Sequence, residues 1–196
     1  GFQPSPKRPN NNVKSPIFVR PTKGVLALVV FTLSAMLIEG AGIDWSIIFM
    51  RDVFSTPPFL NGLAFVLGAF AQFIVRFFAD TFVERYGPVN VSRVSIISMF
   101  IGLIFVCFSI GPYLALFGFA LMGGGTAVLF PLAMSAAAQK TDRSAASNVA
   151  SLAQISFLIF LLAPPFLGYI AENFGIRISF GIGLPLIILS WLFVSS

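Results

Sequence analysis

The stretch from Val75 to Gly87, "VRFFADTFVERYG", carries four charged side chains, yet apolar runs long enough to cross a bilayer lie on both sides of it. A hydrocarbon core about 30 Å thick is crossed by roughly 20 apolar residues in an α-helix. Charge gathered between two such runs is typical of a short loop at a membrane surface. The stretch therefore predicts a chain that crosses the membrane on both sides of this loop.

The composition of the whole chain agrees with a membrane protein. Of its 196 residues, 57% are apolar and only 10% are charged, and the mean hydropathy is +0.94. These values lie outside the range of soluble proteins. We expect an all-α membrane protein with six transmembrane helices, at about 24–50, 60–79, 94–110, 114–138, 148–171 and 178–195.

Several function classes are excluded by residues that the chain lacks. It has no histidine, which removes Ser-His catalysis, His-ligated zinc or haem, and imidazole proton relays. Its one cysteine, Cys107, cannot form an intrachain disulfide and is interpreted as a packing residue. We therefore predict no enzymatic activity, no metal and no cofactor.

Residues 1–23 differ in composition from the rest of the chain. This segment contains five prolines and five Lys or Arg but no acid, which predicts a disordered, basic linker ahead of a six-helix bundle at 24–196. It begins without Met and lacks the pattern of a secretory signal, so we expect the chain to continue from a longer polypeptide.

The positive charges predict the orientation of the bundle. With the linker in the cytoplasm, ten Lys or Arg fall on the cytoplasmic side and only Arg51 and Arg177 on the other. This asymmetry places both termini in the cytoplasm. It also accounts for the isoelectric point near 9.9, so we predict no nucleic-acid partner.

Two interpretations of the charged loop remain open from spacing alone. Arg76 and Asp80 are four residues apart and would share one face of a continuous helix, with Glu84 and Arg85 one turn later. The charges could form a solvated surface pair. They could equally form a latch, in which an acid near the membrane meets a cation or a helix N-terminus of another segment.

The loop resembles a motif of the major facilitator superfamily, R-x-x-x-D-x-x-x-x-R-x-G, found between the second and third helices of each six-helix half. The residues that match are Arg76, Asp80, Arg85 and Gly87. The sequence departs from the motif at Val75, where the family often has Gly, and at Pro88, where a basic residue is common. The resemblance implies that these residues form a cytoplasmic gate.

Further stretches are similar to the same family. They are "GFALMGGGTAVLFPLAMSAAAQ" at 118–139 and "FLLAPPFLGYIAENFGIRISF" at 160–180. The stretch "EGAGIDWSIIFMRDV" at 39–53 is similar to the bacterial fucose-permease-like branch of inner-membrane permeases. Together with the linker, the resemblance implies the C-terminal half of a twelve-helix carrier.

The resemblance implies a secondary-active carrier that moves a small solute across a bacterial inner membrane by alternating access. Whether the carrier is proton-coupled or facilitative stays open. Its partners would be the lipid bilayer and either an N-terminal six-helix half or a second copy of the chain. Two alternatives remain: a self-sufficient homodimeric half-transporter, and a membrane scaffold without transport. The solute, a neutral hydroxylated molecule or an amphipathic one, also stays open.

Acids within the first helix are the main candidates for the transport pathway. Glu39 lies about fifteen residues from the cytoplasmic end, or roughly 22 Å, which is near mid-bilayer. An ionised carboxylate there needs a protein partner, a cation or a water-filled cavity, or it takes up a proton. Asp44 and Trp45 follow near the opposite surface, where they would line the pathway or anchor the helix at the interface.

Polar stripes at helical spacing extend the list of candidates. Such stripes either line a cavity or join helices by hydrogen bonds. The stripe residues are Asn61, Phe65, Gly68, Gln72 and Arg76 on the second helix, and Asn148, Ser151 and Gln154 on the fifth. The predicted pathway residues are Glu39, Asp44, Trp45, Asn61, Gln72 and Gln154.

Glycine and proline residues complete the predictions. Small residues permit close helix packing, and prolines kink a helix and free backbone carbonyls. The residues assigned to these roles are Gly118, Gly123, Gly124, Gly125, Pro131, Pro164 and Pro165.

Overall fold

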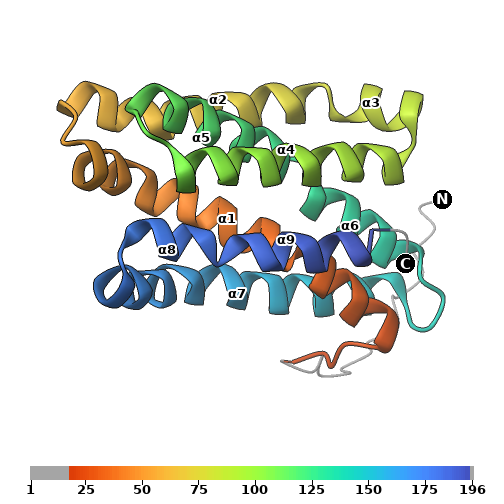
Figure 1. Ribbon diagram of the computed structural model, residues 1–196. Helices are drawn as coiled ribbons and strands as arrows, with labels where there is room; N and C mark the ends of the chain where they lie inside the picture. Colours follow the sequence, from red (N-terminus) through yellow and green to blue (C-terminus); the bar gives the residue numbers. More distant parts are fainter. Residues whose placement is uncertain (1–17, 195–196) are drawn as a thin grey trace, which may run out of the picture.

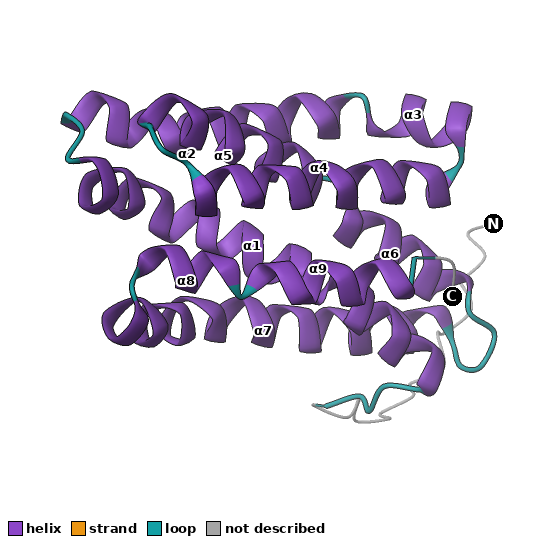
Figure 2. Ribbon diagram, in the orientation of Figure 1, coloured by secondary structure: helices purple, strands orange, loops and turns teal. Residues whose placement is uncertain are grey.

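The computed structural model describes residues 18–194, and this part of the chain is built from α-helices without strands (Figure 2). The helices are α1 (Lys23–Phe54), α2 (Pro58–Phe77), α3 (Ala79–Tyr86), α4 (Pro88–Phe108), α5 (Pro112–Thr126), α6 (Leu129–Gln139), α7 (Ala145–Phe174), α8 (Ile176–Gly181) and α9 (Gly183–Leu192). Figure 1 shows α2, α4 and α5 grouped on one side and α7, α8 and α9 on the other. Helix α1 runs obliquely between the two groups and packs against both.

Five segments are long and apolar enough to cross a membrane. They are α1, α2, α4, the consecutive helices α5 and α6 taken together, and α7. The apolar stretch formed by α8 and α9, Ile176–Leu192, is shorter and is interrupted at Ile182. The C-terminal helix expected at 178–195 is therefore two short helices. Residues 1–17 of the predicted linker lie outside the described residues.

The predicted loop after the second helix contains a helix of its own. Helix α3 occupies 79–86 and ends at Gly87, whose φ of 79° lies in the left-handed region that favours glycine. Pro88 then occupies the first turn of α4, where its missing N–H costs nothing. For these local reasons α4 begins at Pro88, six residues before the predicted start.

Glycines allow α5 to pack closely against two neighbours. A Cβ atom on Gly118 would lie 2.7 Å from the carbonyl oxygen of Gly102 on α4. A Cβ atom on Gly123 would collide with the backbone of Gly68 on α2. Gly124 differs, because a Cβ atom there would make only ordinary contact with Val75 at 3.5 Å. Only some members of the glycine run therefore lie at tight crossings.

An arginine on α8 joins the C-terminal end of α4 to the aromatic core. The guanidinium of Arg177 donates to the carbonyl oxygens of Cys107 and Ser109, both at 2.7 Å, and lies 5.7 Å from the ring centre of Phe49. The last carbonyls of a helix have no partner within the helix, and a cation satisfies them well. Cys107 itself is buried with a free thiol.

The segment before α1 is tied to the loop between α6 and α7. Arg143 donates to the carbonyl oxygen of Arg20 at 2.9 Å, and Asn148 donates to the Asp142 carboxylate at 2.8 Å. Hydrogen bonds from Thr22 and then from Asn148 hold the pKa of Asp142 below its usual value. These contacts fix where the chain enters α1.

We predict that Gly118→Ala lowers the thermal stability of the protein, because the added methyl group would force α4 and α5 apart. Overpacking of this kind costs about 1–3 kcal/mol. The matched control is Gly62→Ala on α2, where a Cβ atom meets nothing within 4 Å and where helix propensity favours alanine. Thermal unfolding in detergent should show a lower midpoint for Gly118→Ala only; equal midpoints would contradict the close crossing.

Candidate functional site

A cavity of about 190 Å³ lies where α1, α2 and α5 meet. Most of its wall is apolar or aromatic, with polar groups contributed by Glu39, Gln72 and Thr126. Its full lining is Ile38, Glu39, Gly42, Ile43, Ala64, Phe65, Gly68, Ala69, Gln72, Phe119, Met122, Gly123 and Thr126. An apolar pocket with a few convergent polar groups is the usual form of a small-molecule site.

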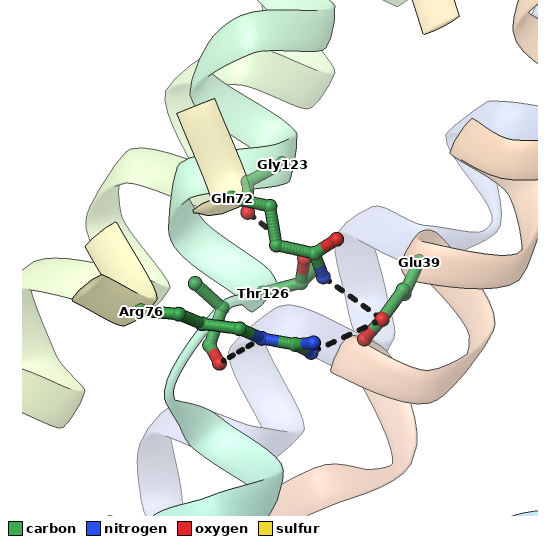
Figure 3. Close-up of polar contacts among 6 residues, drawn as sticks. Glu39, Gln72, Arg76, Gly123 and Thr126 are labelled. Carbon is green, nitrogen blue, oxygen red and sulfur yellow. Dashed lines mark hydrogen bonds and ion pairs between the residues drawn. The ribbon is translucent and has the colours of Figure 1, made fainter. Parts of the chain in front are cut away.

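The carboxylate of Glu39 is bound by two side chains of α2 (Figure 3). Its Oε1 atom accepts a hydrogen bond from Gln72 Nε2 at 2.8 Å and pairs with Arg76 Nη2 at 3.3 Å. Its Oε2 atom is buried and accepts no hydrogen bond from the described part of the chain. The side chain of Glu39 is 15% exposed and that of Arg76 is 48% exposed, so this chain covers the pair only in part.

Gln72 and Arg76 reach the same carboxylate because they are four residues apart on α2 and share a face. Phe65 and Gly68 lie on that face as well and line the cavity. The stripe expected on the second helix is therefore the side that α2 turns toward Glu39.

Arg76 also bridges to the break between α5 and α6. Its Nε atom donates to the carbonyl oxygen of Ala127 at 3.0 Å. In a continuous helix this carbonyl would accept from the N–H of residue 131, but Pro131 has no N–H to donate. The proline thus leaves a free acceptor, and Arg76 occupies it.

The expectation that Arg76 and Asp80 lie on one continuous helix is wrong. The helix does not continue through the loop: α2 ends at Phe77 and α3 begins at Ala79, with Phe78 at φ −98° and ψ 4°. This bend breaks the four-residue spacing. Arg76 therefore points to Glu39, while Asp80 is exposed in the first turn of α3.

The other gate residues occupy the far end of α3 and the turn after it. The guanidinium of Arg85 lies over the ring of Tyr86, 5.4 Å from its centre. Gly87 provides the left-handed turn into α4.

Two predicted pathway residues on α1 lie away from the cavity. Asp44 is exposed. The ring of Trp45 is half-buried and packs against Gly168 of α7, where an added Cβ atom would lie 3.0 Å from it. Trp45 therefore packs α1 against α7.

Two further predicted residues hold local structure together. Asn61 accepts a hydrogen bond from the Thr56 hydroxyl at 2.6 Å, at the turn between α1 and α2. Gln154 on α7 accepts from the backbone N–H of Val19 at 3.0 Å. Neither Asn61 nor Gln154 lines the cavity around Glu39.

Pro164 and Pro165 lie inside α7, which continues through both of them.

Sequence reasoning missed the contribution of α5 to this cavity. Thr126 ends α5 with its hydroxyl donating to the Gly123 carbonyl at 3.1 Å, and Phe119 and Met122 form apolar wall. For the contact between Arg76 and the Ala127 carbonyl, the available signal was Pro131, which predicted a freed carbonyl but not its partner. Across residues 18–194, no three Cys, Asp or Glu side chains gather as a metal site would require.

Comparison with known proteins identifies the family. Residues 26–196 match the Major Facilitator Superfamily. The chain is 32% identical over 162 residues to an uncharacterized transporter of Sinorhizobium fredii, covering 83% of this chain and 43% of that protein. It is 28% identical over 166 residues to an uncharacterized MFS-type transporter of Yersinia pestis, covering 85% of this chain and 43% of that protein. The chain thus spans less than half the length of these relatives, and it belongs to the Major Facilitator Superfamily of membrane transporters.

Proposed function

We propose that this chain is one half, the C-terminal one, of a secondary-active carrier that moves a small solute across a bacterial inner membrane by alternating access. The observation that carries the proposal is the cavity at Glu39, where a carboxylate in a membrane helix is held by Gln72 and Arg76. Acids at such positions are rare in transmembrane helices and commonly mark substrate or proton pathways.

The Glu39–Arg76 pair supports a role for protons. Proton binding to Glu39 would remove the attraction for Arg76 and leave Ala127 as the partner that remains. Such a change alters which helices are joined, which is what a transport cycle needs.

The cavity also limits the class of solute. Its wall is mostly apolar, with aromatic rings from Phe65 and Phe119, and the free Oε2 atom of Glu39 offers an acceptor. A solute with an O–H or N–H donor and an apolar or weakly polar body would fit this wall. Both a hydroxylated neutral molecule and an amphipathic one satisfy that description.

The burial of the spans supports a missing half. Only 11% of the apolar window of α2 and 22% of that of α7 are buried inside this chain, against 61% for α1. Since the chain spans 43% of its relatives' length, we propose that α2 and α7 lie against the other half of the carrier.

We predict that Glu39→Gln, in the complete transporter, abolishes solute accumulation driven by a pH gradient but leaves solute exchange at equal pH partly active. The amide keeps the shape of the side chain and its contact with Gln72 but cannot bind a transported proton. Asp44→Asn is the matched control, since this acid is exposed outside the cavity. Uptake into proteoliposomes measures both; wild-type accumulation by the Gln variant would assign Glu39 a purely structural role.

We predict that Asp80→Asn favours the inward-open state and slows turnover. As a gate residue, Asp80 would dock at a helix N-terminus of the other half, where unpaired N–H groups favour an anion, and so hold the cytoplasmic side closed. A contact made only in the outward-open state shifts the balance between the two states by about 1–3 kcal/mol. Glu84→Gln, on the same short helix, is the control. Labelling of single cysteines on the cytoplasmic side should rise in the Asn variant, and unchanged labelling would exclude the gate.

We predict that vesicles containing only residues 1–196 show no saturable uptake, and that co-expression with the missing half restores it. The reason is that a pathway between two halves has one wall on each. Saturable, solute-specific uptake by the chain alone would instead support a homodimer as the working unit.

A further inference from the structure

A second hollow lies beside an adjacent side of α2, since Ala71 and Val75 are about 60–100° around the helix from Gln72. It is a groove of about 590 Å³ between α2 and α4, with α3 at one end and α5 as its floor. In Figure 1, α5 lies behind the space between α2 and α4, and α3 extends beyond α2. The groove is lined by Ala71, Val75, Phe82, Tyr86, Asn90, Val91, Val94, Ser95, Ser98, Ala120, Leu121 and Gly124.

The floor of this groove is set by small residues. Ala71 on α2 and Ala120 and Gly124 on α5 leave space that larger side chains would fill. The hydroxyl of Ser98 donates to the Leu121 carbonyl at 3.0 Å, so it offers the groove no free donor. The interior is therefore a long apolar surface.

One end of the groove has the chemistry of a membrane interface. Tyr86 lines it, and the guanidinium of Arg85 lies 5.4 Å from the centre of that ring. Asn90 donates one amide hydrogen to the Tyr86 carbonyl at 3.0 Å and keeps a second. Tyrosine and arginine are typical of the level at which lipid headgroups lie.

The acids of α3 lie on the side of that helix away from the groove. At 3.6 residues per turn, Asp80 and Glu84 are each about 200° from Phe82, which faces the groove. Arg85, over the ring of Tyr86, is therefore the charged side chain of α3 on the groove side of the helix.

We propose that the groove binds one phospholipid, with an acyl chain along Ala71, Val94 and Ala120 and its phosphate beside Arg85. In a bilayer an apolar groove is filled by alkyl chains, since water there would lack polar partners. Arginine forms paired hydrogen bonds with phosphate oxygens. This lipid would be a fixed ligand that packs α3 against α4, separate from the solute cavity at Glu39.

The test uses a photoreactive benzophenone amino acid in the intact membrane protein, reconstituted with equal parts of phosphatidylethanolamine and phosphatidylglycerol. One variant carries it at Val94, which is 67% exposed and lines the groove. The control carries it at Ile101, also on α4 and 39% exposed, outside that groove. Both are extracted into lipid-free detergent and then illuminated.

A bound lipid should stay in the groove during extraction and form a cross-linked product at Val94 on illumination. No lipid product should form at Ile101. Ala71→Leu and, separately, Ala120→Leu should lower the Val94 product about tenfold, since filling the floor removes the chain's packing. Arg85→Gln should lower it as well, whereas Arg93→Gln should not. Equal products at Val94 and Ile101, or a Val94 product unchanged by both filling variants, would overturn the proposal. Transport is not the readout, so this result is independent of the proposed carrier function.

Discussion

The arrangement of α1, α2 and α5 depends on how the chain accommodates the carboxylate of Glu39. Desolvating a charge is costly, and breaking a buried pair by removing one partner is more damaging than never having formed it. Gln72 and Arg76 meet this requirement from one face of α2. That solution demands that α2 present a polar face to α1, while little of the rest of α2 is covered by this chain.

Close helix packing makes this geometry possible. Gly123 brings α5 against Gly68 of α2, one turn from Gln72, and Gly118 brings the same helix against α4. These contacts leave no room for a side chain at the crossings, so the cavity forms beside them, where Phe119 and Met122 are the larger residues. In membranes such packing replaces the hydrophobic effect, which cannot distinguish one apolar helix from the surrounding lipid.

Hydropathy and charge were sufficient to predict the helical class and most of the spans, because both depend on length and composition. Periodicity also identified the face of α2 that carries Gln72. Periodicity placed Arg76 on this face as well, but it could not predict that Arg76 pairs with Glu39, because spacing within α2 does not show which residue of α1 lies opposite. The contact of Gln154 with the backbone of Val19 could not be predicted either, because a backbone partner far along the chain leaves no trace in side-chain spacing.

The same arginine that compensates Glu39 also satisfies Ala127, so one side chain connects α1, α2 and the break before α6. Its side chain is 48% exposed. A pair that is exposed to this extent contributes on the order of 1 kcal/mol, well below a fully buried pair. A much stronger pair would lock the three elements in one arrangement, and an absent one would leave the carboxylate without compensation. A contact of intermediate strength can be exchanged at modest cost, which fits the transport cycle proposed for this chain.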